Sequence, residues 1–262
     1  MDGALAPPQF FQLVANPQRW QLLAELAESD RSVTELTLLL GKPQNLLSYH
    51  LAELRRAGVV TARKSSADRR DSYYRVDLVR CGELLGEAGA ALHPALRLNP
   101  QPAPPEARQR PGRVPLVLFL CTGNSARSQM AEALVDQRSG HTVNARSAGS
   151  HPKPLHQNAV RAMAELGIDI SGRPTKHFRR FAGTRFDHEI TLSDKVKEIC
   201  PEFPGPPATR HWSMADPASE GSTDEETYPA FLALARELEA RVGFLLAQIS
   251  TEQGRRKRLR GK

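Results

Sequence analysis

The stretch Val114-Pro-Leu-Val-Leu-Phe-Leu-Cys121-Thr-Gly-Asn-Ser-Ala-Arg127-Ser128 decides the fold of the C-terminal half of the chain. Its apolar run predicts a buried strand, and the small residues after Cys121 predict a loop that leads into a helix beginning near Ser128. Such a strand, loop and helix gather successive backbone N–H groups into one concavity at a helix N-terminus. The stretch therefore predicts a site for a tetrahedral oxyanion.

Cys121 occupies the first position of this loop, at the floor of the expected anion site. The helix dipole, the loop amides and Arg127 all favour a thiolate there, which predicts a nucleophile. Gly123 and Asn124 tolerate left-handed backbone angles. Arg127 offers a planar fork to two anion oxygens, and Ser128 is able to donate a hydrogen bond to the sulfur. We expect the oxyanion contacts to come from Thr122, Gly123, Asn124, Ser125, Ala126 and Arg127.

A cysteine after a strand is more often a small buried hydrophobe than a nucleophile. The complete set of loop residues in register with Cys121 favours the nucleophile. Cys81 and Cys200 are the other two cysteines, and no pair has C-x-x-C spacing. The sequence thus predicts neither a disulfide framework nor a metal site, and reactive thiol chemistry is the better expectation.

The chain has 262 residues, which is long enough for two domains. A hydrophobic content of 40% with 6% aromatic residues indicates soluble globular folding. No apolar stretch approaches the ~20 residues of a membrane helix. The N-terminus lacks a basic region followed by an apolar segment, so it does not resemble a secretory signal. We therefore expect a cytoplasmic protein that does not contact a membrane.

The segment 99–113 contains five prolines and no large apolar residue, which is typical of an extended, semi-rigid linker. It separates residues 1–98 from a second domain at 114–250, and residues 251–262 form a basic tail. The formal charge is +7, and the six positive charges of residues 254–262, which contain no acid, account for all but one of it. We expect the tail to be disordered and solvated, with a nucleic-acid contact as the alternative.

Residues 1–98 show the apolar period of helices in the segments 10–14, 20–26 and 33–40. Ser32 and Glu35 predict a capping box at the start of the third of these helices, and Gly41 predicts its end. A further helix over 43–58 has leucines on one face, at positions 47, 51 and 54. Its other face carries the short polar groups that we expect to meet base edges, namely Gln44, Asn45, Ser48 and Tyr49.

Two predicted strands, 59–64 and 73–76, flank a polar hairpin tip. Between Arg55 and Arg75 seven basic residues stand against two acidic ones. A wing with this charge, including Arg69 and Arg70, would lie against DNA phosphates while the preceding helix reads sequence. A winged helix is therefore predicted, with an all-helical adaptor as the alternative.

This region resembles the ArsR/SmtB winged-helix repressors, particularly in the segments 46–54 and 71–75. The resemblance implies binding to operator DNA as a homodimer that reads palindromic half-sites. Metal or arsenite sensors of that family usually carry paired cysteines before the recognition helix, or Asp and His ligands on the last helix. Here the corresponding helix has no cysteine, and the last helix, at about 78–92, offers only Cys81. We expect Cys81 to be a packing residue.

The C-terminal half resembles the low-molecular-weight protein tyrosine phosphatases and the thioredoxin-type arsenate reductases that share their fold. The Cys-x5-Arg-Ser pattern carries this resemblance, together with the segments 147–149, 167–171, 190–194 and 211–218. The resemblance implies an α/β domain with a four-stranded parallel sheet. It also implies that Asp216, in Asp216-Pro217-Ala218, is the acid that protonates the departing oxygen. Ala218 favours a reductase, because the phosphatases tend to have an aromatic residue there.

Reductases of this type that use thioredoxin relay oxidation through two further cysteines. This chain keeps one of them as Cys200, but Ser193 replaces the other, and Ala126 stands where some reductases have a loop cysteine. Either Cys200 is the resolving thiol, or an external thiol such as mycothiol, glutathione or thioredoxin attacks directly. The open alternatives are a phosphatase and a non-catalytic regulator that senses phosphate or arsenate. No bound cofactor or metal is expected.

Overall fold

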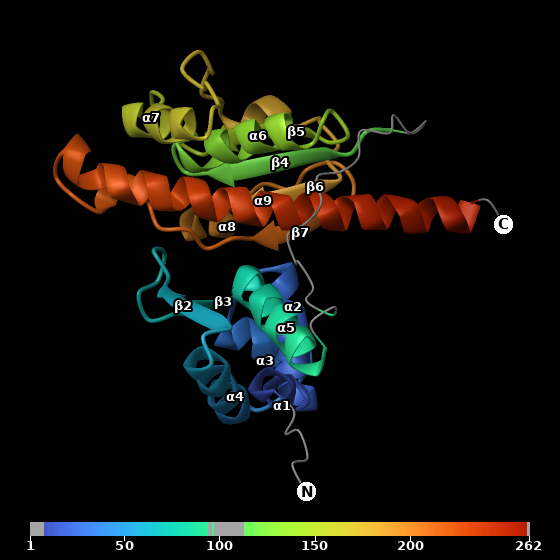
Figure 1. Ribbon diagram of the computed structural model, residues 1–262. Coiled ribbons are helices and arrows are strands. Elements are labelled where there is room, and N and C mark those ends of the chain that lie inside the picture. The colour runs from blue at the N-terminus through green and yellow to red at the C-terminus, as the bar shows by residue number, and fades with distance from the viewer. Residues whose placement is uncertain (1–7, 94–95, 97–112, 261–262) are drawn as a thin grey trace, which may run out of the picture. The chain divides into compact units, whose positions relative to one another are not determined.

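The computed structural model describes the backbone of residues 8–93, 96 and 113–260, and the side chains of these residues up to 254. Two compact units divide between Gln101 and Pro102 (Figure 1). The predicted linker at 99–113 lies outside the described residues except for Arg113. Within the described residues, no helix is both long enough and apolar enough to cross a membrane.

The N-terminal unit is a bundle of helices with a small antiparallel sheet in the strand order β1-β3-β2. The predicted helices and both predicted strands are present, so the winged-helix prediction is confirmed in its elements. In chain order they are α1 (Gln9–Val14), α2 (Pro17–Glu28), β1 (Arg31–Ser32), α3 (Val33–Leu40), α4 (Gln44–Arg56), β2 (Val60–Lys64), β3 (Ser72–Val76) and α5 (Leu78–Leu92).

Local sequence signals fix the ends of α3. Ser32 Oγ accepts a hydrogen bond from Glu35 N, and the Glu35 carboxylate accepts one from Ser32 N, which completes the predicted capping box. Gly41 ends the helix with φ 60°, a left-handed conformation that glycine adopts without strain. The next helix, α4, then buries Leu47, Leu51 and Leu54 completely against α2 and α3. Its opposite, polar face is therefore left to solvent.

The C-terminal unit is an α/β layer structure around a parallel sheet in the order β5-β4-β6-β7, which confirms the expected four-stranded sheet. Its elements are β4 (Leu116–Cys121), α6 (Arg127–Arg138), β5 (Asn144–Gly149), α7 (Gln157–Glu165), the 3-10 helix η2 (Phe178–Phe181), β6 (His188–Thr191), α8 (Asp194–Ile199), β7 (Ala208–His211), the 3-10 helix η3 (Pro217–Ser219) and α9 (Asp224–Arg260).

The two faces of this sheet have separate cores because successive side chains of a strand point to opposite faces. On β4, Val117, Phe119 and Cys121 pack into the larger core, which α6, α7 and α9 complete. Leu118 and Leu120 pack into a second core with aromatic residues of the connections and with α8. The two cores lie on opposite faces of the sheet, so the side chain of Cys121 lies on the face that α6 and α9 cover.

The C-terminal tail differs from its expected state. We predicted a disordered tail from residue 251, but the backbone of α9 continues as helix to Arg260. The residues of α9 that precede the tail pack against the sheet, and Leu245, Leu246 and Ile249 among them are almost fully buried. A helix that is already formed adds further residues at little cost, so this packed segment supports the propagation of α9 into the basic residues.

Candidate functional site

The thiol of Cys121 lies at the end of β4, in the loop that leads into α6. The residue is 1% exposed. Its Sγ accepts a hydrogen bond from Asn124 N at 3.2 Å and lies 3.0 Å from Ser128 Oγ. Arg127 and Ser128 are the first two residues of α6, so the sulfur lies beside the N-terminus of a 12-residue helix. The sulfur thus accepts one backbone hydrogen bond and lies within hydrogen-bond distance of a hydroxyl at the start of this helix.

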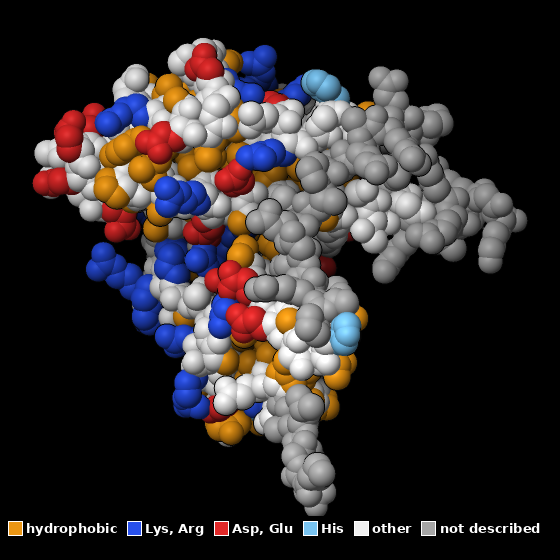
Figure 2. Space-filling view, viewed as in Figure 1, with side chains coloured by type: hydrophobic (Ala, Val, Ile, Leu, Met, Phe, Trp, Pro, Cys, Tyr) orange, Lys and Arg blue, Asp and Glu red, His pale blue; other side chains and the backbone are white. Residues whose placement is uncertain are grey.

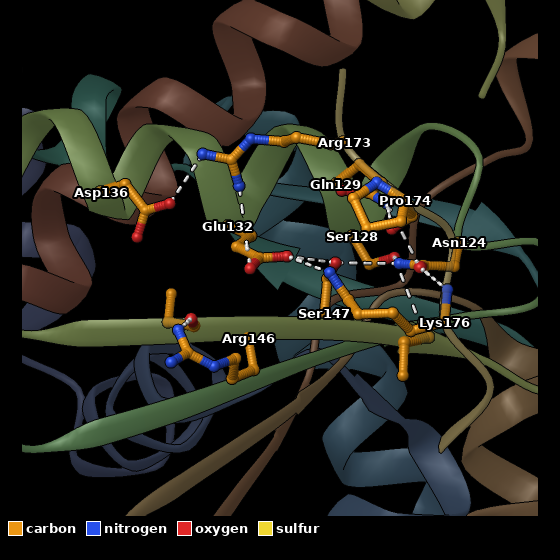
Figure 3. A network of polar contacts seen from close by, with 12 residues as sticks. Asn124, Ser128, Gln129, Glu132, Asp136, Arg146, Ser147, Arg173, Pro174 and Lys176 are labelled. Carbon is orange, nitrogen blue, oxygen red and sulfur yellow. Dashed lines mark hydrogen bonds and ion pairs between the residues drawn. The ribbon is translucent and has the colours of Figure 1, made fainter. Parts of the chain in front are cut away.

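Asn124 holds the shape of the loop. Its backbone has φ 47°, and its side chain is fully buried. The side-chain Oδ1 accepts hydrogen bonds from Lys176 N and Gln129 Nε2, and Nδ2 donates to Ser128 Oγ and to Ser147 Oγ (Figure 3). With both of its polar atoms satisfied, the amide links the loop to α6, to β5 and to the segment before η2. The sequence indicates that Asn124 tolerates this left-handed conformation, but it does not indicate these distant partners.

Behind the loop lies a buried carboxylate, that of Glu132 on α6, whose side chain is 8% exposed. It accepts a hydrogen bond from Ser147 Oγ and lies 3.1 Å from Lys176 Nζ. Arg173 lies 3.7 Å from Glu132 and also pairs with Asp136 on the surface (Figure 3). Sequence reasoning missed this cluster, because its members come from three segments and no local pattern brings them together.

We predict that Lys176→Met destabilises the C-terminal unit by about 2 to 3 kcal/mol, because the buried Glu132 carboxylate loses its nearest positive charge. Unfolding in urea, followed by Trp212 fluorescence in a Trp20→Phe background, measures the change. Lys195→Met removes a lysine from the exposed side of α8 and is the matched control, expected within about 0.5 kcal/mol of the parent. Equal stability of the two variants would contradict the structural importance of the Glu132 pairing.

Gly149, at the end of β5, allows the loop to pass close to the sheet. A Cβ atom there would lie 2.6 Å from Thr122 O and 2.7 Å from Asn124 N, both rigid backbone atoms. The Ser-Ala-Gly segment that contributes to the family resemblance thus has a steric explanation. Any side chain at this position would displace the loop that carries Cys121.

Arg127 and Asp216 meet although 88 residues separate them in the chain. The Arg127 side chain is 6% exposed, and its Nη2 lies 3.1 Å from Asp216 Oδ2. Its Nη1 donates to Met214 O at 3.2 Å. Asp216 is 54% exposed and caps η3 through Ala218 N. The structure therefore brings the predicted anion-binding arginine and the predicted acid together at the N-terminus of α6.

Cys200 lies away from this site. It packs with Val196 and Phe203 against the second core of the sheet, on the face opposite to Cys121. Its Sγ donates to Glu189 Oε1 at 2.9 Å. Burial raises the pKa of the Cys200 thiol, and the hydrogen bond to Glu189 raises it further. Both the position of Cys200 and the raised pKa of its thiol argue against a resolving role. Burial likewise raises the pKa of Cys81 to about 11, as expected of a packing thiol.

Ser193 lies next to the cysteine loop instead. Its Oγ is 3.0 Å from Thr122 Oγ1, and Thr122 directly follows Cys121. The pairing of β4 with β6 is consistent with this contact, because Leu120, two residues before Thr122, pairs with Thr191, two residues before Ser193. The residue that replaces the first relay cysteine is therefore adjacent to the site. In the described part of the chain, no group of three or more His, Cys, Asp or Glu side chains could hold a metal ion.

The predicted DNA-contacting residues lie on the surface of the N-terminal unit. The polar residues of α4 and the two wing arginines are all exposed, namely Gln44, Asn45, Ser48, Tyr49, Arg69 and Arg70. Beside them, an open groove between α4 and β2 is lined by Ala52, Arg55, Arg56, Val60, Thr61 and Ala62. Figure 2 shows lysine and arginine side chains gathered on one side of this unit. One surface thus combines short polar groups on a helix with basic groups beside it.

Comparison with known protein families agrees with both halves of this description. The family model described as low molecular weight phosphotyrosine protein phosphatase matches residues 116–255, and that of the bacterial regulatory proteins of the arsR family matches residues 16–62. The first match spans more than half of the chain, so the chain belongs to the low-molecular-weight phosphatase family and carries an arsR-family region ahead of it. The members of the phosphatase family are thiol-dependent enzymes.

The curated relatives include arsenate reductases. That of Halalkalibacterium halodurans is 36% identical over 127 residues, and that of Bacillus subtilis is 37% identical over 127 residues. Each alignment covers 48% of this chain and 91% of the relative. A solved structure, described as an arsenate reductase in the phosphate binding state, is 26% identical, with a TM-score of 0.42. That alignment covers 52% of this chain and 98% of the solved chain.

Proposed function

We propose that the C-terminal unit reduces arsenate with an external thiol and that the N-terminal unit reads operator DNA, so that one chain joins an arsenic-resistance enzyme to a transcription regulator. The observation that carries the enzymatic half is the position of Cys121 Sγ, within hydrogen-bond distance of Asn124 N and Ser128 Oγ at the start of α6. Arsenate reductases with 36–37% identity over the same region support arsenate as the substrate.

In the proposed reaction, the loop amides and Arg127 bind the arsenate oxygens. The Cys121 thiolate attacks arsenic and forms an S–As bond, while Asp216 protonates one oxygen, which leaves as water. A thiolate donor then attacks the Cys121 sulfur. The electron pair of the broken S–As bond goes to arsenic, which leaves as arsenite in the +3 state. The resulting mixed disulfide on Cys121 is opened by a second donor thiolate, which restores the enzyme and forms a donor disulfide.

An external donor is proposed because the described part of the C-terminal unit has no second thiol beside Cys121. Cys200 packs on the other face of the sheet, and Ser193 cannot form a disulfide. Incubating the protein with arsenate and with mycothiol, glutathione or thioredoxin in turn, and measuring arsenite, tests the proposal. Turnover with at least one donor is the expected result. Absence of turnover with all three would overturn the enzymatic half.

Two other functions remain as defined alternatives. Phosphatase activity has support from the family match, and it would be recognised by hydrolysis of p-nitrophenyl phosphate that greatly exceeds arsenate reduction. A regulator that only senses phosphate or arsenate has support from Ser193 and Ala126, where relay thiols stand in related reductases. Operator binding that changes with either oxyanion, without turnover, would select the sensor.

The DNA-reading half of the proposal is supported by the arsR-family match and by the exposed polar face of α4. We propose that the chain acts as a homodimer through its N-terminal unit. The neighbouring helices α1 and α5 expose apolar side chains that a second copy would cover, namely Phe11, Val79, Leu85 and Leu92. A dimer would present two copies of α4 to the two half-sites of a palindromic operator.

The wing gives a direct test of this half. We predict that the double variant Arg69→Gln, Arg70→Gln weakens binding by about tenfold on all duplexes. The slope of log affinity against log salt concentration should fall in magnitude by about 1 to 2, because fewer counterions are released from the DNA when two phosphate contacts are missing. Ser48→Ala on α4 is the contrasting variant, expected to weaken operator binding while changing the slope little. Fluorescence anisotropy at several salt concentrations measures both. Wild-type binding by the wing variant would contradict the assignment.

A further inference from the structure

A buried polar cluster that the proposed reaction does not use lies where β6 and β7 end. The side chain of Asp194, the first residue of α8, is fully buried, and that of His211, the last residue of β7, is almost fully buried. Asp194 Oδ1 lies 3.1 Å from His211 Nε2 and accepts a hydrogen bond from Ser213 Oγ at 2.7 Å. His211 Nδ1 is 2.9 Å from Thr191 Oγ1, at the end of β6. One carboxylate thus ties the end of β7, and the residue two positions later, to the start of α8.

The segment 212–216 connects β7 to η3 and carries the proposed acid, Asp216. Trp212 and Met214 pack into the larger core of the sheet. Ser213 stands between them and donates to the carboxylate at the start of α8 instead. Core packing and this hydrogen bond together fix the course of the segment as far as Met214.

The fixed part of the segment leads directly to the two groups that meet Arg127. Met214 O accepts a hydrogen bond from Arg127 Nη1, and Asp216 Oδ2 lies 3.1 Å from Nη2. Asp216 is half exposed, so packing alone does not fix its side chain, and its position depends on the backbone that precedes it. A displacement of about 1 Å at a reacting group lowers a rate by up to about a hundredfold. The position of this backbone therefore matters for the proton transfer.

The buried cluster is explained better by this positioning than by a gain in stability. Burying a carboxylate costs hydration, and replacing a buried ionisable pair by apolar residues is often neutral or stabilising. Asp194 also lies in the first turn of α8, where the helix dipole favours a carboxylate. That interaction does not require the side chain to be buried against His211 and Ser213. What the two hydrogen-bonded contacts add is a fixed geometry for the segment that follows β7.

We propose that Asp194 is a positioning residue for Asp216, the proposed acid. Its contacts with His211 and Ser213 hold the segment 212–216 where the acid meets the departing oxygen. This inference rests on the proposed function, in which Asp216 gives a proton to that oxygen. Asp194 touches neither arsenate nor the thiol donor in this role, so its effect on the rate passes through Asp216. Loss of its hydrogen bonds should therefore lower the rate only while Asp216 is able to donate a proton.

The test is a double-mutant cycle in the full-length protein, with Ser213→Ala and Asp216→Asn. Single-turnover reduction of arsenate gives the rate, and isothermal titration with phosphate gives the Kd. We expect Ser213→Ala to lower the rate by about tenfold in the parent and by less than about twofold in the Asp216→Asn background, with the Kd within about twofold in both. Ser139→Ala is the matched control. It removes a fully buried hydroxyl that donates to Val143 O at 3.0 Å, at the opposite end of α6 from the site, and should change neither quantity.

Asp194→Asn is a second variant, which keeps the shape of the side chain and removes its charge. It should lower the rate at least as much as Ser213→Ala in the parent and, again, little in the Asp216→Asn background. Rate losses of similar size in the two backgrounds would overturn the proposal, as would an unchanged rate in both variants. Phosphate binding weakened as much as the rate would also overturn it, because the cluster would then hold Arg127 rather than the acid.

Failure of the proposed function is distinguishable from failure of this inference. If the parent reduced no arsenate with any donor, the same cycle would be measured on hydrolysis of phenyl phosphate, whose poor leaving group also needs a proton. Coupling between Ser213 and Asp216 in that reaction would keep the positioning role and reject only the reductase. Additive effects would overturn the positioning role, and a parent inactive in both reactions would overturn both proposals.

Discussion

Replacing Cys121 by serine should lower kcat/KM for arsenate, with a thiol donor in excess, by at least about a thousandfold. A serine hydroxyl keeps the approximate shape of the side chain, but it is not ionised at neutral pH and cannot form the disulfide that accepts the two electrons. The loop and Arg127 would still bind the anion, so phosphate should continue to bind to the variant. Arsenite formation measures the first effect, and isothermal titration with phosphate measures the second.

Two matched variants make this result specific to position 121. Cys200→Ser and Cys81→Ser should each retain activity within about twofold, because neither thiol lies in the cysteine loop and Cys200 lies on the opposite face of the sheet. Mass spectrometry after arsenate and donor treatment should find the donor attached to Cys121 alone. If Cys200→Ser abolished turnover, or if a bridge between Cys121 and Cys200 formed, the external-thiol mechanism would be wrong.

The elements that could be predicted from the sequence are those with local causes. The capping box of Ser32 and Glu35, the left-handed Gly41 and the strand that ends at Cys121 each depend on residues within a few positions of one another. The apolar spacing on α4 likewise predicts which leucines are buried. In each case the energetic cause lies within one helix or one strand and its adjoining turn, and such causes are visible in a single sequence.

The parts that could not be predicted depend on distant partners. The polar contacts of Asn124 span up to 52 residues, and the buried pair of Glu132 and Lys176 spans 44. The sequence around Cys200 does not show that this residue packs on the face of the sheet opposite to Cys121. Its position relative to Ser193 is equally compatible with a thiol that lies close to Cys121. The tail was mispredicted because composition alone ignores the packed helix that precedes it.

The sheet topology explains why Ser193 lies beside the cysteine loop and Cys200 does not. Ser193 stands at the carboxyl end of β6, directly beside the loop after β4, whereas Cys200 follows the short helix α8 and returns to the second core. A relay thiol is useful only if it reaches the loop, and the position that lies beside the loop carries serine. In the proposed mechanism, a serine at this position leaves no relay thiol beside the loop, and the donor would be supplied from outside.

Asp216→Asn should reduce kcat for arsenate by about 10² to 10⁴, the usual contribution of a positioned acid. The amide cannot give a proton to the departing oxygen, so the barrier to breaking the As–O bond rises. Binding should behave differently. In the structure Asp216 Oδ2 lies 3.1 Å from Arg127 Nη2, so an oxyanion must compete with this carboxylate for the guanidinium. The variant should consequently bind phosphate as tightly as the parent or more tightly.

This split between slower chemistry and undiminished binding distinguishes an acid from a residue that only holds the loop, since loss of a structural contact would weaken both. Glu220→Gln removes an exposed carboxylate four residues further along the same segment and is the matched control, expected to leave both quantities unchanged. Single-turnover measurement keeps donor steps out of the comparison. A parent-like rate in Asp216→Asn would assign the proton to another group. Weaker phosphate binding would mean instead that the carboxylate holds Arg127 in its anion-binding position rather than competing with the anion for it.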